Sequence, residues 1–157
     1  MKKILACLLC LSFILVAFCS CGNTVDYSDK VIDVNALAAR LNTKLTFVDD
    51  LALVDENIVN ALYGFKGTEK LVVYAAGGAT PEEIIIAEYA TVDDAKAALP
   101  SFEARVKNQE KTFDTYNPEY RPLLNGMYLK QLGKYVVYCV SSSNDDIAGI
   151  VSAVFEG

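Results

Sequence analysis

Cys21 is the residue whose surroundings most clearly predict a chemical modification. Lys2 and Lys3 give the chain a positive start, and the apolar residues 4–18 follow. This order is typical of an export signal, and the apolar stretch is shorter than the ~20 residues that a membrane span needs. Ser20 precedes the cysteine and Gly-Asn follows it, as at the cleavage site of a bacterial lipoprotein signal. We therefore expect the thiol of Cys21 to be diacylated before cleavage.

Cys19 is a second candidate for lipidation, although bulky Phe18 would then stand at the cleavage site. An uncleaved anchor and plain secretion also remain open. The favoured reading divides the chain into a signal peptide (1–20), a lipidated polar tether (21–30) and a single domain (31–157). Because two acyl chains anchor a protein stably, we expect the domain to be lipid-anchored on the extracytoplasmic face of the cell membrane.

The composition excludes several classes of function. The chain carries 14 basic and 20 acidic residues, and the predicted signal removes two lysines and no acid. An acidic domain is repelled by DNA and RNA, so we expect no nucleic-acid partner. The sequence has no histidine, which excludes Ser-His and Cys-His triads and every histidine-ligated metal site.

Two further features could carry chemistry but favour structural roles. Cys139 lies in the middle of an apolar segment, where a small buried hydrophobic residue is expected more than a reactive thiol. Gly77 and Gly78 could approach a phosphate, but Glu82 and Glu83 follow them and would repel it. The glycines therefore predict a hairpin turn.

The acidic and hydroxyl residues form no recognisable catalytic or metal-binding pattern. The spacing of the acids between residues 49 and 56 fits no calcium loop and favours helix caps and a solvated surface. Glu82, Glu83 and Glu88 could contribute to a glycosidase pair, but the separation of two carboxylates cannot be derived from sequence. Residues 141–143 are three serines without a recognisable base, and they favour a cap for the last helix. We expect no catalytic residue, no metal and no cofactor.

Tyrosine is the least ordinary feature of the domain, with nine residues in the chain. Five of them follow the longest predicted helix: Tyr116, Tyr120, Tyr128, Tyr135 and Tyr138. Tyrosine supplies rigid, amphipathic contact area at interfaces. The candidate binding surface is therefore Tyr116, Asn117, Pro118 and Tyr120. The alternative is that these tyrosines pack against the sheet.

Apolar periodicity and turn residues predict the elements that would position these side chains. Helices are expected from Asp33 to about Asn42, after Asp55, from Thr91 to about Tyr116, from Asn117 to Gly126, and over Asn144–Phe155. Strands are expected over Leu71–Ala76, Glu83–Tyr89, Met127–Leu132 and Tyr135–Ser141. Pro100 predicts a kink or two abutting helices within the longest one. Residues 80–83 also match a helix-capping pattern, but the three isoleucines that follow favour a strand.

After residue 70 the order is β-β-α, a short helix, and β-β-α again. This loose repeat predicts an α+β fold in which an antiparallel sheet of about four strands, in two hairpins, has helices packed on it. Residues 135–140 are apolar on both faces of the predicted strand, which favours a central position in the sheet.

The sequence resembles a family at several places together. They are the lipoprotein-like start, Tyr63-Gly64, the strands at residues 72–75 and 83–86, the motif Tyr116-Asn117-Pro118-Glu119-Tyr120, and residues 133–136. The chain is similar over about residues 31–156 to a domain-of-unknown-function family of small lipoproteins, mainly from Gram-positive anaerobes. The resemblance implies a lipoprotein with no assigned activity, catalytic residue or ligand.

These observations predict a non-catalytic envelope module. Its expected partner, besides the lipid anchor in the membrane, is an envelope protein or a cell-wall component. The alternative is a subunit that binds a small molecule or delivers a substrate to an envelope complex. A concave pocket with a few converging polar groups would favour this alternative.

Overall fold

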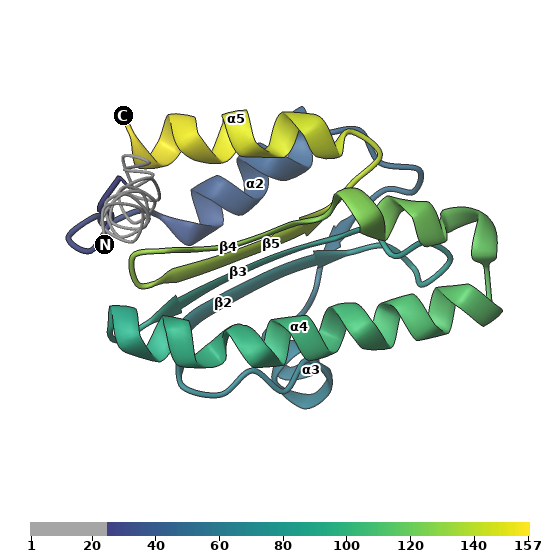
Figure 1. The fold of residues 1–157 in the computed structure, drawn as a ribbon, viewed down its shortest axis with the longest axis horizontal. Helices are drawn as coiled ribbons and strands as arrows, with labels where there is room; N and C mark the ends of the chain where they lie inside the picture. The colour runs from purple at the N-terminus through teal and green to yellow at the C-terminus, as the bar shows by residue number, and fades with distance from the viewer. Residues whose placement is uncertain (1–24) are drawn as a thin grey trace, which may run out of the picture.

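The computed structural model describes residues 25–157, apart from the side chain of Asn60. In this part of the chain an antiparallel sheet of five strands has the order β1-β2-β3-β5-β4 (Figure 1). The strands are β1 (Ala52–Leu53), β2 (Thr68–Ala75), β3 (Glu83–Tyr89), β4 (Tyr128–Leu132) and β5 (Tyr135–Val140). The predicted α+β class and both hairpins are confirmed. The count of about four strands missed β1, whose two residues are too few to give a periodic pattern.

Helices cover both faces of the sheet (Figure 1). Helices α2 (Val34–Lys44) and α5 (Asn144–Phe155) lie on one face. Helices α3 (Glu56–Leu62) and α4 (Val92–Thr115) lie on the other, and the 3-10 helix η1 (Pro118–Gly126) follows α4. The three layers therefore enclose two apolar cores, one on each side of the sheet.

Strand β5 separates these cores. All six of its residues are buried, and it pairs with β3 on one side and β4 on the other. Side chains alternate along a strand, so Tyr135 and Cys139 enter the core beneath α2 and α5, while Tyr138 and Val140 enter the core beneath α4. The prediction of a central strand is confirmed.

Helix α4 runs through Pro100 as one element of 24 residues. The prediction of two abutting helices is therefore wrong. Proline removes one backbone hydrogen bond, to the carbonyl four residues earlier, and both Pro100 and Lys96 are exposed, so water can solvate the freed group. Buried Ala95 and Phe102 hold the helix against the sheet on both sides of the proline.

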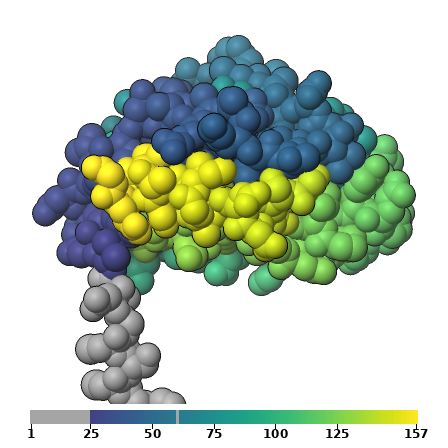
Figure 2. Space-filling model, turned by 90° about the horizontal axis from the view of Figure 1, so that it is seen from above, coloured from purple at the N-terminus to yellow at the C-terminus, as the bar shows by residue number. Residues whose placement is uncertain are grey.

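The residues before α2 pack against the end of α5 and the β4–β5 turn. The ring of Tyr27 meets the ring of Phe155 edge-on at 5.3 Å, and its hydroxyl donates to Glu156 at 3.2 Å. Gly133, in the turn, has a φ of +57°, and a Cβ there would lie 2.1 Å from the Tyr27 carbonyl oxygen. Figure 2 shows this first segment, in purple, beside the yellow end of α5. We call residues 25–30 the docked segment.

Candidate functional site

Glu82 and Glu83 are neighbours in sequence but lie on opposite sides of the sheet. Glu83 begins β3 and faces α4, where it contacts Arg105. Glu82 faces the loops on the other side and contacts Val48 and Ser142. Glu88 lies near the other end of β3, paired with Lys134 at 2.7 Å. The structure therefore does not bring these three carboxylates together as a glycosidase pair.

The Glu83 carboxylate is held by two side chains from α4. Arg105 donates from Nε to Oε1 at 2.7 Å and from Nη2 to Oε2, and Gln109 donates from Nε2 to Oε1 at 2.7 Å. The guanidinium also lies over the ring of Tyr63, 4.1 Å from its centroid. A paired, stacked guanidinium of this kind is geometrically fixed. The pair thus joins α4, the start of β3 and the end of α3.

Two opposing effects act on Glu83. Burial raises its pKa, while the hydrogen bonds and charge of Arg105, with the hydrogen bond from Gln109, lower it. Burial prevails, and the pKa stays above its ordinary value. The ion pair is therefore a compact, internally neutralised group beneath α4.

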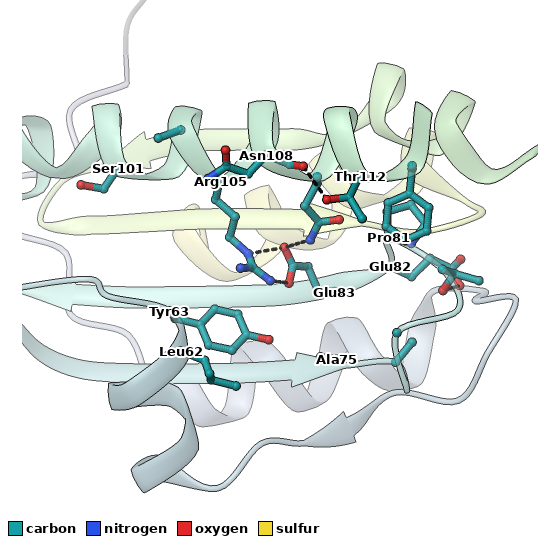
Figure 3. Close-up of a pocket in the computed structure, with 16 residues that line it drawn as sticks. Leu62, Tyr63, Ala75, Pro81, Glu82, Glu83, Ser101, Arg105, Asn108 and Thr112 are labelled. Carbon is teal, nitrogen blue, oxygen red and sulfur yellow. Dashed lines mark hydrogen bonds and ion pairs between the residues drawn. The ribbon is translucent and has the colours of Figure 1, made fainter. Parts of the chain in front are cut away.

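A cleft of about 470 Å³ opens above this pair. Figure 3 shows α4 on one side of it and Leu62 and Tyr63 on the other. The β2–β3 turn closes one end with Gly78, Thr80 and Pro81. The space exists because small residues occupy both the sheet floor and the facing side of α4: Ala75, Ala76, Ser101 and Ala104.

Unused polar atoms lie at the base of the cleft. The Oε1 atom of Gln109 is buried and has no hydrogen-bond partner among the described residues. Arg105 uses Nε and Nη2 on Glu83, and its Nη1 donates to no described side chain or backbone group. A buried acceptor without a partner costs about 1–3 kcal/mol. The cleft therefore offers one acceptor and one donor that both come from residues bound to the same carboxylate.

Glu82 also borders one end of the cleft, but its carboxylate joins three loops on the opposite side of the sheet. Its carboxylate is 1% exposed, yet no basic side chain within residues 25–157 pairs with it. It accepts hydrogen bonds from the amides of Val48 and Asp49 at 2.8 and 3.3 Å, and from the hydroxyls of Thr80 and Ser142 at 3.2 and 2.8 Å. Its position is structural: these donors replace the water that a charged carboxylate would otherwise bind.

The predicted binding surface borders the cleft without lining it. Tyr116 ends α4 with 70% of its surface exposed, whereas Tyr120 is half-buried. Asn117 donates from Nδ2 to the carbonyl of Ala79 at 3.2 Å, which fixes η1 to the β2–β3 turn. Pro118 is exposed at the start of η1. The predicted surface therefore lies next to the cleft, and its role in binding stays a prediction.

The other three tyrosines of the predicted group pack in the sheet, as the alternative expected. Tyr128, Tyr135 and Tyr138 are buried, and they divide between the two cores. The hydroxyl of Tyr135 accepts a hydrogen bond from the amide of Ile32 at 3.1 Å. Cys21, the predicted lipidation site, lies outside the described residues.

The three serines before α5 serve loop contacts more than helix capping. Ser143 occupies the N-cap position, but its hydroxyl accepts from the amide of Thr46 at 2.9 Å and makes no capping bond. Ser141 accepts from the amide of Ser143 at 3.0 Å, and Ser142 binds Glu82. The expectation that a serine side chain caps α5 is therefore wrong, because the adjacent loop competes for the hydroxyl.

Sequence reasoning missed Arg105, Gln109 and Tyr63. Arg105 and Gln109 are four positions apart and share one face of α4, a signal that was present in the sequence. Their partner Glu83 is 22 and 26 positions away, and only tertiary packing brings it beside them. The hairpin turn at Gly77 and Gly78 was predicted correctly.

Cys139 is expected to be unreactive in the folded protein. It is fully buried in β5, and burial, followed by the charges of Glu83 and Glu82, raises the pKa of its thiol. Because the thiolate is the nucleophile, maleimide should not modify it until the chain unfolds. Mass spectrometry of the peptide containing Cys139, after labelling with and without denaturant, tests this. Rapid labelling of the native protein would contradict the buried position.

Residues 25–157 hold neither a membrane-spanning helix nor a metal-binding cluster. None of the helices there combines the length and apolar character of a membrane span. No group of three or more acidic or cysteine side chains there is placed to hold a metal ion.

Comparison with known proteins gives one match. A family described as "Domain of unknown function (DUF4358)" matches residues 45–141, more than half of the chain. The matched region contains all five strands and every residue that lines the cleft, while α2 and α5 lie outside it. No curated protein and no solved structure matches the chain.

Proposed function

This chain belongs to the DUF4358 family of domains of unknown function, and from that premise we propose that it is a non-catalytic domain that binds a small polar group in the cleft between α3 and α4. The observation that carries the proposal is the base of the cleft. There a fixed ion pair lies beside an acceptor, Gln109 Oε1, that has no partner among the described residues. Groups already held in place bind a ligand with less loss of conformational entropy.

The unused atoms favour an amide as the ligand group. Gln109 Oε1 can accept from an N–H, and Arg105 Nη1 can donate to a carbonyl oxygen. A peptide unit or a carboxamide carries both groups. A carboxylate would supply only acceptors, and it would meet an arginine whose charge Glu83 already balances on an acidic domain. The ligand class is therefore a neutral, amide-bearing molecule such as a short peptide.

Binding fits the cleft better than catalysis. Both oxygens of Glu83 accept hydrogen bonds from Arg105, so neither is free to take a proton from a substrate. The neighbouring Ser101, Asn108 and Thr112 are polar but have no basic side chain activating them among the cleft residues.

We place this binding domain on the outer face of a membrane, held by acyl chains on Cys21. The support is the basic and apolar start of the chain and the Ser20-Cys21-Gly22 sequence. Amide-bearing partners that such a domain would meet are peptide segments of envelope proteins and of the cell wall. The exposed Tyr116 beside the cleft could extend the contact with such a partner.

An NMR titration tests the ligand class. We expect N-acetyl-alanine N-methylamide to shift the backbone amides of Tyr63 and residues 104–112, with acetate and glucose producing smaller shifts at equal concentration. The variant Gln109→Met keeps the length of the side chain but removes the acceptor, together with the hydrogen bond to Glu83. It should weaken binding of the amide probe about 5- to 10-fold, as for one lost hydrogen bond to the ligand of about 1–1.5 kcal/mol.

Lys107→Met is the matched control, because Lys107 is exposed on α4 and does not line the cleft. It should leave the titration unchanged. Equal shifts from all three probes, or shifts that do not depend on Gln109, would contradict an amide site in this cleft.

A further inference from the structure

The docked segment connects the folded domain firmly to whatever precedes it in the chain. Tyr27 is fixed by Phe155 and Glu156 of the C-terminal end and by the close approach of its carbonyl to Gly133. The amide of Lys30 donates to the Tyr27 carbonyl at 3.1 Å, which closes a turn. The backbone therefore leaves the domain at a defined place.

That place and the cleft lie at opposite ends of the molecule. In β3, Glu88 pairs with Tyr135 beside the β4–β5 turn, whereas Glu83 pairs with Val140 at the far end. Helix α4 runs in the direction opposite to β3. It begins at Val92, whose carbonyl accepts from Gln131 near the turn, and ends at Thr115 near the predicted tyrosine surface. Its 24 residues span about 36 Å. Figure 1 shows the β4–β5 turn and the C-terminus at one end and η1 at the other.

We propose that the docked segment fixes the pose of the domain on the membrane, with the β4–β5 turn towards the bilayer and the cleft away from it. This rests on the lipid anchor at Cys21 proposed above. Only six residues lead from Cys21 to Tyr27, and even fully extended they span at most about 21 Å. The domain is longer than this reach along α4, so it cannot turn end over end while Tyr27 stays docked.

Two exposed apolar residues of this end suit a lipid surface as its neighbour, and Asp26 and Asp29 are exposed beside them. Val25, the first residue of the docked segment, is 56% exposed, and Val31, which follows the segment, is 78% exposed. Moving a small apolar side chain from water to the headgroup region is favourable, because part of its apolar surface leaves the water. The partner of this end is thus the bilayer, and the cleft end is left for ligands.

Energy transfer from a single tryptophan measures the pose, because the natural chain contains no tryptophan. The substitutions Lys96→Trp and Tyr116→Trp place the donor on exposed positions at the two ends of α4, about 30 Å apart along the helix axis. The lipidated protein, recovered from bacterial membranes, is reconstituted into phosphatidylcholine vesicles that contain dansyl-labelled lipid. We expect several-fold stronger transfer from the Lys96→Trp protein than from the Tyr116→Trp protein.

Two further variants test the docked segment itself. Gly133→Ala places a methyl group against the Tyr27 carbonyl, and Tyr27→Ser removes the ring and its bond to Glu156. Each should free the segment and bring the two transfer efficiencies close together. Gly149→Ala is the matched control, since a Cβ there meets nothing within 4 Å, and the contrast between the two positions should persist.

The outcomes separate the pose from the anchor. Vesicle flotation reports anchorage directly, and a protein that does not float with the vesicles overturns both the anchor and the pose. A protein that floats but gives equal transfer from both positions overturns the pose alone. If transfer from position 96 stays stronger than from position 116 in both the Gly133→Ala and the Tyr27→Ser variants, the role of the docked segment is overturned.

Discussion

Replacing Glu82 with alanine is expected to destabilise the domain by about 3 kcal/mol, although Glu82 has no basic partner among the described residues. The substitution removes the acceptor shared by the amides of Val48 and Asp49 and the hydroxyls of Thr80 and Ser142. The hydroxyls can rotate towards other acceptors. The amides are fixed by the backbone in a partly buried loop and would lose their acceptor, which gives the loss its size.

Urea unfolding of the alanine variant measures this loss, and two other variants show its origin. Glu82→Gln retains one carbonyl oxygen, so it should lose about half as much as Glu82→Ala. Glu103→Ala changes an exposed glutamate on α4 and should stay within about 0.5 kcal/mol of the natural protein. An alanine variant as stable as the natural protein would show that the three loops are held by other contacts.

Replacing Arg105 with methionine is expected to cost about 3–5 kcal/mol at neutral pH, because it leaves the buried Glu83 carboxylate without its counter-charge. Glu83 is 2% exposed, so the guanidinium and Gln109 supply the contacts that water would otherwise make with its carboxylate. The cation–π contact with Tyr63 is lost as well.

This loss should shrink as the solution is acidified. Burial raises the pKa of Glu83, and Arg105 is the main group that lowers it, so the pKa in the Arg105→Met variant lies higher than in the natural protein. A carboxyl whose folded pKa is raised stabilises the fold below its unfolded pKa and loses that contribution as the pH rises through the folded value. The free energy of unfolding of the Arg105→Met variant is therefore closest to that of the natural protein in mild acid and furthest from it near neutral pH.

A double-mutant cycle with Glu83→Leu completes the test. Removing both charges leaves no uncompensated group, so the double variant should be more stable than Arg105→Met alone. Denaturant unfolding at pH 5 and pH 7 is measured for the natural protein, the two single variants and the double variant. It gives the coupling free energy between Arg105 and Glu83 and its dependence on pH. A loss that does not change with pH, or a double variant no better than the single one, would contradict a buried, unpaired Glu83 as the cause.

The sequence predicted most elements because their signals are local. The boundaries of β3 agree with the structure, since residues 84–86 are isoleucines and the Gly77-Gly78 turn precedes the segment. The boundaries of α5 agree too, because its apolar stripe has strict helical spacing. Strand β1 was missed because two exposed residues carry no periodicity, and it exists only through its pairing with β2.

The candidate site was harder to predict because it depends on tertiary contacts. Sequence shows that Arg105 and Gln109 share a helix face, but not that this face lies over the start of β3. The same limit applies to Glu82 and Glu83. Only the alternation of side chains, once β3 was placed in the sheet, shows that one carboxylate serves the loops and the other the cleft.

The strand order has a consequence for the route by which the chain folds. Each hairpin, β2–β3 and β4–β5, joins residues close in sequence, but the two meet through β3 and β5, and residues 90–134 lie between those strands. Closing so long a segment costs chain entropy before any pairing offsets it. We therefore expect the two hairpins to form early and independently. Their pairing along β3 and β5, which also completes both cores, is the expected slow step.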